Sequence, residues 1–286
     1  MKRRDFIKAV TAGVILSGVA PFSLVSAKQL LPRPQRLAQA SFDSHIKDYL
    51  HKMQNFDHMH PDDIYVEKEL LPVLRSCVAR LKRLEIMVGH GNFYLLGFDH
   101  ALKVARNYPE VGEFTKEEQD FLERIFYTDS SVYGFFGEKP IDRMTLRINK
   151  NDAIKIPFTG NYVYRGISHE IYKKLKKSAG DKLYLTSGIR GVVKQFLLFL
   201  DKTETNKGNL SLASRSLAPP GYSHHGIADF DVGQVGYGAL NFTERCTTTE
   251  VFKKLEDLEY VSLRYKEGNL KGVRFEPWHI KVFPRT

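Results

Sequence analysis

The sequence contains little cysteine, with only Cys77 and Cys246 among its 286 residues. Two cysteines so far apart do not make the disulfide framework of a small exported domain, and neither has the paired spacing of a zinc ribbon. Cys77 lies in a helical pattern, so we expect it to be a buried free thiol. The length suffices for one large domain or two small ones with a substantial hydrophobic core.

A hydrophobic run long enough to span a membrane is also missing. The apolar stretch from Ala9 to Leu24 has roughly 16 residues, fewer than the roughly 20 that a spanning helix needs. It follows the charged start Met1-Lys2-Arg3-Arg4 and precedes the small residues Val25-Ser26-Ala27, as in a secretory signal of the twin-arginine type. We therefore expect residues 1–27 to be a signal peptide. The protein would be periplasmic or in the cell envelope, with the membrane only as its export route.

Negative charge is in the minority, since 43 Lys and Arg face 33 Asp and Glu, for a net charge of +10. Residues 1–27 contribute +3, which leaves +7 after them. A basic exported protein suits an anionic partner such as the wall polymer, a lipid surface or carboxylate-bearing peptides. No Lys/Arg-rich helix interleaved with aromatics is present, and export leads away from nucleic acid, so we expect no nucleic-acid partner. We expect a monomer.

Residue periodicity predicts an α+β protein with a helical N-terminal region. Residues 28–41 lack periodicity and indicate a linker. Residues 42–150 are mostly helical, with apolar residues at helical spacing from Leu70 to Leu84 and a capping box at Thr115–Glu118. The stretch 129–151 is rich in glycine and aromatics, which indicates an ordered loop packed under the helices.

Residues 151–286 change to short strands mixed with helices, which predicts a small antiparallel sheet. We expect a helix capped by Ser168 and ended by Gly180, then a strand over 182–186, a turn over 187–190 and a helix over 192–200. Further along we expect a helix over 250–258 and two antiparallel strands over 260–265 and 272–275.

Candidate metal ligands lie in one stretch, Pro219–Gly233, which contains two adjacent histidines and two carboxylates spaced by one residue. Imidazole nitrogen and carboxylate oxygen are the ligands of an open zinc site. Asp229 and Asp231 face the same side of a strand, so the pattern alone does not choose between them.

Glu276-Pro277-Trp278-His279 offers a third ligand and a base. Pro277 places this segment at a sheet edge or where a strand leaves the sheet, and a carboxylate near the imidazole can act as a general base. Arg190 lies on the turn between a strand and a helix, where a guanidinium can bind a carboxylate or a developing oxyanion.

Together these segments resemble the D-alanyl-D-alanine carboxypeptidase family of zinc peptidases, which includes the vancomycin-resistance carboxypeptidases and dipeptidases. The resemblance covers roughly residues 154–282 and rests on three motifs in the family's order. These are Ser187-Gly-x-Arg190 with Gln195, then Ser223-x-His225 with Asp231, and last Glu276-x-x-His279.

The resemblance implies that residues 151–286 are a zinc carboxypeptidase-like catalytic domain. It implies His225, Asp231 and His279 as Zn²⁺ ligands and Glu276 as the general base that activates water. Arg190 would stabilise the oxyanion or hold the peptide, while Ser223 and Gln195 would contact the substrate. The implied reaction is hydrolysis of peptidoglycan stem peptides, most simply by a D,D-carboxypeptidase.

One departure leaves alternatives open. The family pattern has seven positions from histidine to aspartate, whereas His225 and Asp231 are six apart. His224 with Asp231 restores seven, and His225 with Asp229 gives the four of lysostaphin-like peptidases. We favour His225 with Asp231 and expect His224 at the rim of the cleft. Alternative functions are an endopeptidase or L,D-carboxypeptidase with the same site, and a non-catalytic wall-binding protein.

Overall fold

A computed structural model describes residues 33–259 and 261–283, with side chains from Ser44 onward. The expected signal peptide, 1–27, lies outside the described residues. Residues 44–286 group into one compact unit, and the account below concerns its described part. Within the described ranges, no helix is both long enough and apolar enough to cross a membrane.

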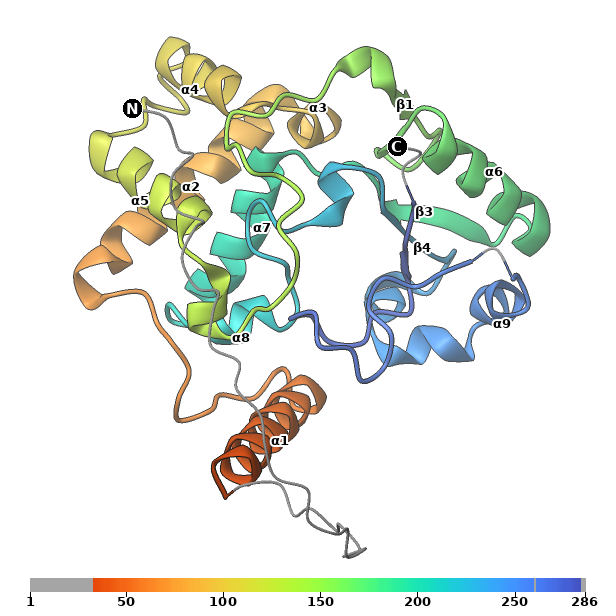
Figure 1. Cartoon of the computed structure of the whole chain (residues 1–286). Coiled ribbons are helices and arrows are strands. Elements are labelled where there is room, and N and C mark those ends of the chain that lie inside the picture. The colour runs from red at the N-terminus through yellow and green to blue at the C-terminus, as the bar shows by residue number, and fades with distance from the viewer. Residues whose placement is uncertain (1–32, 260, 284–286) are drawn as a thin grey trace, which may run out of the picture. The chain divides into compact units, whose positions relative to one another are not determined.

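The first half of this unit is helical, as expected (Figure 1). Its helices are α1 (Arg33–Gln54), α2 (Leu71–Val88), α3 (His90–Tyr94), α4 (Phe98–Asn107) and α5 (Lys116–Tyr127), with 3-10 turns η1 (Lys68–Leu70), η2 (Ser130–Tyr133) and η3 (Lys150–Asp152). Because α1 begins at Arg33, residues 33–41 are helical, and the assignment of 28–41 as a linker stays a prediction. The capping box is confirmed, since the Thr115 side chain accepts from the Glu118 N–H and the Glu118 side chain accepts from the Thr115 N–H.

A large apolar core joins these helices to α7 (Val192–Thr205), which packs on α2, α3 and α4. We call these helices, together with α7, the helical half of the unit. The apolar face of α2 faces this core, as its helical spacing predicts. The glycine-rich stretch 129–151 is ordered, and Tyr133, Phe135 and Ile141 are buried in the same core. Cys77 is buried there as a free thiol, as expected.

The second half contains two small antiparallel sheets. Strands β1 (Ala153–Lys155) and β2 (Tyr162–Tyr164) form one, and β3 (Leu183–Ser187), β4 (Phe230–Gln234) and β5 (His279–Ile280) form the other in that order. Helix α6 (Ile167–Ala179) packs on β3 and α9 (Glu250–Glu256) on β4, around a second apolar core. The remaining elements are α8 (Leu210–Ser214), η4 (His224–Gly226), η5 (Gly238–Phe242) and η6 (Glu244–Thr248).

Two local predictions in this half are wrong. Ser168 lies inside α6 rather than at its cap, and its hydroxyl donates to the Ala228 carbonyl 2.8 Å away. The expected hairpin of 260–265 with 272–275 does not form among the described residues. Instead, the Arg264 N–H donates to the His279 carbonyl at 3.1 Å, so this stretch runs beside β5.

The segment 272–275 leaves the sheet and packs on the helical half. The Gly272 N–H donates to the Tyr49 hydroxyl at 2.5 Å, and the Arg274 N–H donates to the Arg215 carbonyl at 2.9 Å. Val273 is buried in the large core. Partners far away in the sequence therefore override the local strand pattern of this segment.

Candidate metal centre

Two predicted metal ligands and one serine of the arginine motif lie in a row across the three-stranded sheet. Asp231 on β4 is the register partner of Ser187 on β3 and of His279 on β5. A bulge in β3 between Leu185 and Ser187 shifts the register at this point, and such bulges redirect side chains beside functional sites. The three strands come from segments that are far apart in the sequence, and their pairing places Asp231 next to His279 and Ser187.

His225 reaches this row from the 3-10 turn η4 and not from a strand. Its Nδ1 lies 2.7 Å from the Gly188 carbonyl oxygen. A Cβ on Gly188 would lie 1.8 Å from the Tyr162 carbonyl oxygen, so only glycine allows the turn after β3 to approach β2 this closely. The turn thereby holds both the His225 ring and the backbone of Arg190, whose N–H donates to the His225 carbonyl at 3.2 Å.

The inner atoms of His225, Asp231 and His279 form a set with the chemistry of a metal site. One ligand atom from each lies within 4.8 Å of the other two. Because a carbonyl oxygen only accepts, the His225 Nδ1 carries the proton and its Nε2 is an acceptor. That nitrogen faces the Asp231 Oδ1 at 3.2 Å, so two acceptors point at one place. A cation between them would satisfy both, and the donor set fits zinc.

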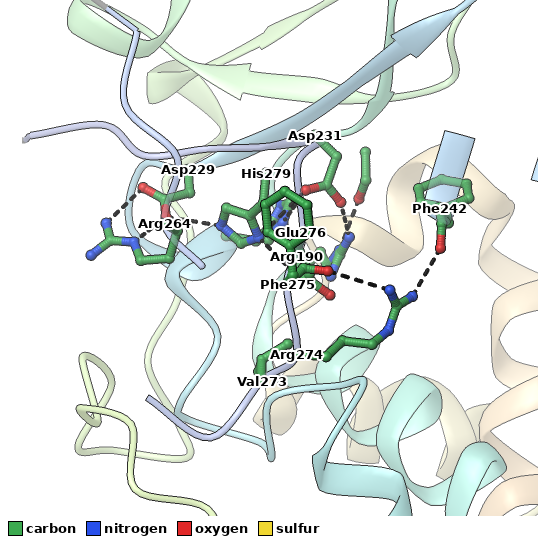
Figure 2. A network of polar contacts seen from close by, with 12 residues as sticks. Arg190, Asp229, Asp231, Phe242, Arg264, Val273, Arg274, Phe275, Glu276 and His279 are labelled. Carbon is green, nitrogen blue, oxygen red and sulfur yellow. Dashed lines mark hydrogen bonds and ion pairs between the residues drawn. The ribbon is translucent and has the colours of Figure 1, made fainter. Parts of the chain in front are cut away.

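Asp229 supports the opposite side of the His279 ring. Its Oδ2 lies 2.9 Å from the His279 Nε2, and Arg264 donates to both of its carboxylate oxygens at 2.7 and 2.9 Å (Figure 2). The Val282 N–H donates to the Oδ1 at 2.9 Å. With these partners Asp229 fixes the orientation of the His279 ring through its Nε2. The Nδ1 of the ring lies 3.5 Å from the Asp231 Oδ1.

The surrounding charges favour a cation at this place. Burial alone would lower the pKa of His279, but hydrogen bonds with Asp229 and Glu276 raise it to about 9. Burial alone would raise the pKa of Asp231, but His225 and Arg190 lower it to about 2. Burial lowers the pKa of His225 to about 4. At neutral pH Asp231 is therefore anionic and His225 neutral, which are the forms that bind metals. His279 is protonated, and a metal ion at its Nδ1 would displace that proton.

Glu276 and Arg190 flank the three residues. The Glu276 Oε2 lies 3.2 Å from the His279 Nδ1, so this carboxylate stands at the same inner side of the ring. The Arg190 Nη2 donates to the Asp231 Oδ2 at 2.5 Å, and its Nε donates to the Ser187 hydroxyl at 2.8 Å. The remaining N–H groups of the guanidinium are left for other acceptors.

Gln195 and Ser223 also lie in the lining of the cleft. The Gln195 amide is bonded to backbone on both sides, since its Nε2 donates to the Arg190 carbonyl at 2.7 Å and its Oε1 accepts from the Gly221 N–H at 2.8 Å. Gly221 has a φ of 90°, which suits glycine in the Pro-Pro-Gly turn. Gln195 thus joins the arginine turn to the loop that carries the histidines.

The cleft in front of these residues has a volume of about 300 Å³ and is lined from both halves of the unit. Tyr94 of α3 and Lys194 of α7 form part of its wall, opposite residues of the sheet. His224 is buried with an unbonded Nδ1 and does not line this cleft. The expectation that His224 lies at the cleft rim is therefore wrong.

Comparison with known families agrees with this geometry. A family model described as D-alanyl-D-alanine carboxypeptidase, VanY, matches residues 168–285. Residues 168–285 are a VanY domain. The match contains the predicted site residues from Arg190 to His279, and of the residues that line the cleft Tyr94 lies outside it. A search of curated proteins finds no match for the chain.

The match confirms the resemblance to this family, and the structure confirms the α+β fold, a helical region followed by a sheet-containing domain. Its match begins inside the segment 151–286 that we assigned to catalysis, and the boundary at residue 150 stays a prediction. The sequence motifs missed Arg264, Lys194 and Arg274. Arg274 alone of these three lies next to a motif, because it is two residues before Glu276 in the sequence.

Proposed function

We propose that this protein is a zinc-dependent D-alanyl-D-alanine carboxypeptidase acting on peptidoglycan stem peptides. The observation that carries the proposal is the convergence of His225, Asp231 and His279, with Glu276 beside them, in a cleft of a VanY domain. The family match by itself supports a carboxypeptidase-like peptidase domain.

His225 through Nε2, Asp231 through its carboxylate and His279 through Nδ1 would hold the zinc ion. Zinc bound there lowers the pKa of water and polarises a carbonyl group. Asp229 would keep the His279 Nε2 protonated and its Nδ1 directed inward, as carboxylates do behind metal-binding histidines.

Glu276 would act as the general base. Its carboxylate takes the proton from the attacking water and passes it to the leaving amine nitrogen as the peptide bond breaks. No covalent intermediate with the protein is needed. Its position next to the inner nitrogen of His279 supports this role, because a base must lie within hydrogen-bond reach of its proton.

Arg190 would stabilise the oxyanion that develops on the attacked carbonyl. Two of its N–H groups are fixed by Asp231 and Ser187, so the others would already be oriented toward the cleft. The guanidinium would then need no reorganisation free energy when the oxyanion forms. Gln195 would also position Arg190 through its backbone carbonyl, and Gln195 and Ser223 both stay predicted substrate contacts in the lining.

Export to the periplasm or cell envelope, with the twin-arginine signal and a monomeric state, belongs to the same proposal. Peptidoglycan lies there, and the net charge of +10 suits a substrate with carboxylates. Fractionation of cells that produce the full chain tests the localisation, with Arg3→Lys/Arg4→Lys as the variant expected to stay in the cytoplasm.

Metal analysis with a turnover assay tests the chemistry. We expect about one zinc per chain, lost in His279→Ala and kept in Glu276→Gln. Glu276→Gln should reduce hydrolysis by about 10²- to 10⁴-fold. A purified protein without zinc, together with unchanged turnover in Glu276→Gln, would rule out the proposed chemistry.

Mass spectrometry of digested muropeptides identifies the bond. Loss of one terminal alanine from pentapeptides is expected for the proposed carboxypeptidase. Separated cross-links would instead show an endopeptidase, and cleavage of tetrapeptides to tripeptides an L,D-carboxypeptidase. A zinc-loaded protein that leaves every muropeptide intact would support the wall-binding alternative.

A further inference from the structure

Three arginine and lysine side chains line the cleft, and two of them already have a carboxylate partner. Arg190 is paired with Asp231, and the Lys194 Nζ lies 2.8 Å from the Glu85 Oε1. Arg274 forms no ion pair with any of the residues that the structure describes, although it lines the same cleft. Glu276, Glu244 and Asp57 lie close enough to act on its charge, but none of them forms a direct ion pair with it. A ligand can therefore still supply a directly bonded anion.

The Arg274 guanidinium is held in a fixed orientation. Its Nη2 donates to the Phe242 carbonyl at 2.8 Å and its Nη1 to the Phe275 carbonyl at 3.3 Å (Figure 2). Its central carbon lies 4.2 Å from the ring centroid of Phe56 and 4.8 Å from that of Trp278. Aromatic rings on a guanidinium restrict its motion and leave its edge available for hydrogen bonds.

The hydrogen bonds of this guanidinium are incomplete. The Arg274 Nε is buried and has no hydrogen-bond partner. Two carbonyls use two of the five N–H donors that an arginine offers. A planar carboxylate matches the spare donors, because guanidinium and carboxylate form paired, charge-assisted hydrogen bonds.

We propose that Arg274 binds the C-terminal carboxylate of the peptide substrate and thereby makes the enzyme act on chain ends. The inference rests on the proposed function and adds its selectivity for a free terminus. Arg274 lies two positions before Glu276 in the same segment, so base and anchor move together. The cleft wall beside Arg274 includes Val273, Leu217 and Ala218, an apolar surface that suits a small side chain such as the methyl group of alanine.

Binding measurements separate this inference from the peptidase reaction. The probe is diacetyl-L-lysyl-D-alanyl-D-alanine, compared with its C-terminal amide, on zinc-loaded Glu276→Gln protein, which should not turn it over. We expect the acid to bind about tenfold to a hundredfold more tightly than the amide. Adding Arg274→Gln should abolish this preference, and adding Arg274→Lys should restore part of it.

Lys271→Gln is the matched control, because it removes one positive charge from an exposed residue of the same segment that does not line the cleft. It should keep the acid preference. Thermal unfolding of each variant checks that Arg274→Gln still folds, and Arg274→Lys preserves the charge if it does not.

The outcomes are distinct. An acid-to-amide ratio that Arg274→Gln leaves unchanged would overturn the inference even if hydrolysis is confirmed. A preference for the acid that disappears in Arg274→Gln would support carboxylate binding by Arg274. If the protein with an intact Glu276 nevertheless releases no D-alanine, the proposed reaction is ruled out while the carboxylate binding stands. In a third outcome the acid and the amide bind equally to the parent protein, while a carboxylate on a side chain of the probe improves binding through Arg274. Arg274 would then bind a side-chain carboxylate and not the C-terminal one, and this result would contradict the inference.

Discussion

The helical half and the sheet half of residues 44–283 are stabilised in different ways. The helical core buries large apolar side chains completely, among them Leu84, Phe126 and Phe196. The sheet half has a smaller apolar core and strands of two to five residues. Burial of apolar area favours folding in both halves, but only the sheet half also depends on a buried carboxylate that contacts a candidate metal ligand.

Two ion pairs of the same geometry show the contrast. In the helical half, Arg124 donates to both oxygens of Glu67, and each side chain is 55 % exposed. In the sheet half, Arg264 donates to both oxygens of Asp229, and the side chains are 7 % and 0 % exposed. An exposed pair contributes little, whereas removing one partner of a buried pair leaves an uncompensated charge. The same contact should therefore matter very differently in the two places.

The largest effect is expected for Arg264→Met. Asp229 would remain buried without its arginine partner, with only the His279 ring and the Val282 N–H beside it. This loss should lower the free energy of unfolding by about 3–5 kcal/mol. Because Asp229 also orients His279, the affinity for zinc should fall by about 10- to 100-fold. Urea denaturation of the metal-free protein and competition with a chromophoric chelator measure the two effects.

Arg124→Met is the matched control, and it should change the unfolding free energy by about 0–1 kcal/mol with no change in zinc affinity. Equal losses in the two variants would show that burial does not distinguish the pairs, and the contrast between the halves would be lost.

The difference between the halves also explains what the sequence could predict. Helical spacing and the Thr115–Glu118 capping box are local signals, so α2 and α5 were predicted close to their observed positions. The hairpin expected over 260–275 failed because its partners lie elsewhere. The first part runs beside β5, and Val273 is buried against the helices. Short strands carry too little local information to specify their neighbours.

The site shows the same division. The motif segments identified His225, Asp231, Glu276 and His279, and the structure brings these four together. Spacing alone could not distinguish Asp229 from Asp231, because both lie near His279. The distinction is in the contacts, since Asp229 is occupied by Arg264, and no motif pointed to that arginine.

A second, smaller effect is expected for Leu84→Ala in the helical core. Leu84 has 0 % exposure, so the truncation should leave a cavity and cost about 2–5 kcal/mol of unfolding free energy. Zinc affinity should stay unchanged, because Leu84 lies in the helical core and is not among the residues that line the cleft. The same denaturation and chelator measurements apply, and a tenfold fall in zinc affinity would show that the helical core shapes the site after all.

The smallest effect is expected for Glu118→Gln, which changes one of the buried carboxylates among the helices, where Asp63 is another. Glu118 is 2 % exposed and accepts from Ser76 at 2.6 Å, Arg80 at 2.9 Å and the Thr115 N–H at 2.9 Å. Glutamine keeps the shape and part of the hydrogen bonding, so we expect a loss of about 1 kcal/mol at pH 7. Its effect on zinc affinity should be nil.

The pH dependence of that loss makes the test specific. Burial raises the pKa of Glu118, but hydrogen bonds from Ser76 and Arg80 outweigh it and hold the pKa below its usual value. The unfolded chain, with a glutamate pKa of about 4.3, therefore binds this proton at higher pH than the folded protein. The stabilisation is present above about pH 5 and is lost as the pH falls through the folded pKa. Urea denaturation at a series of pH values below 7 should show the difference between the two proteins shrinking as the pH falls. A difference that does not change with pH would mean that Glu118 acts through packing, and that charge contributes nothing to this capping box.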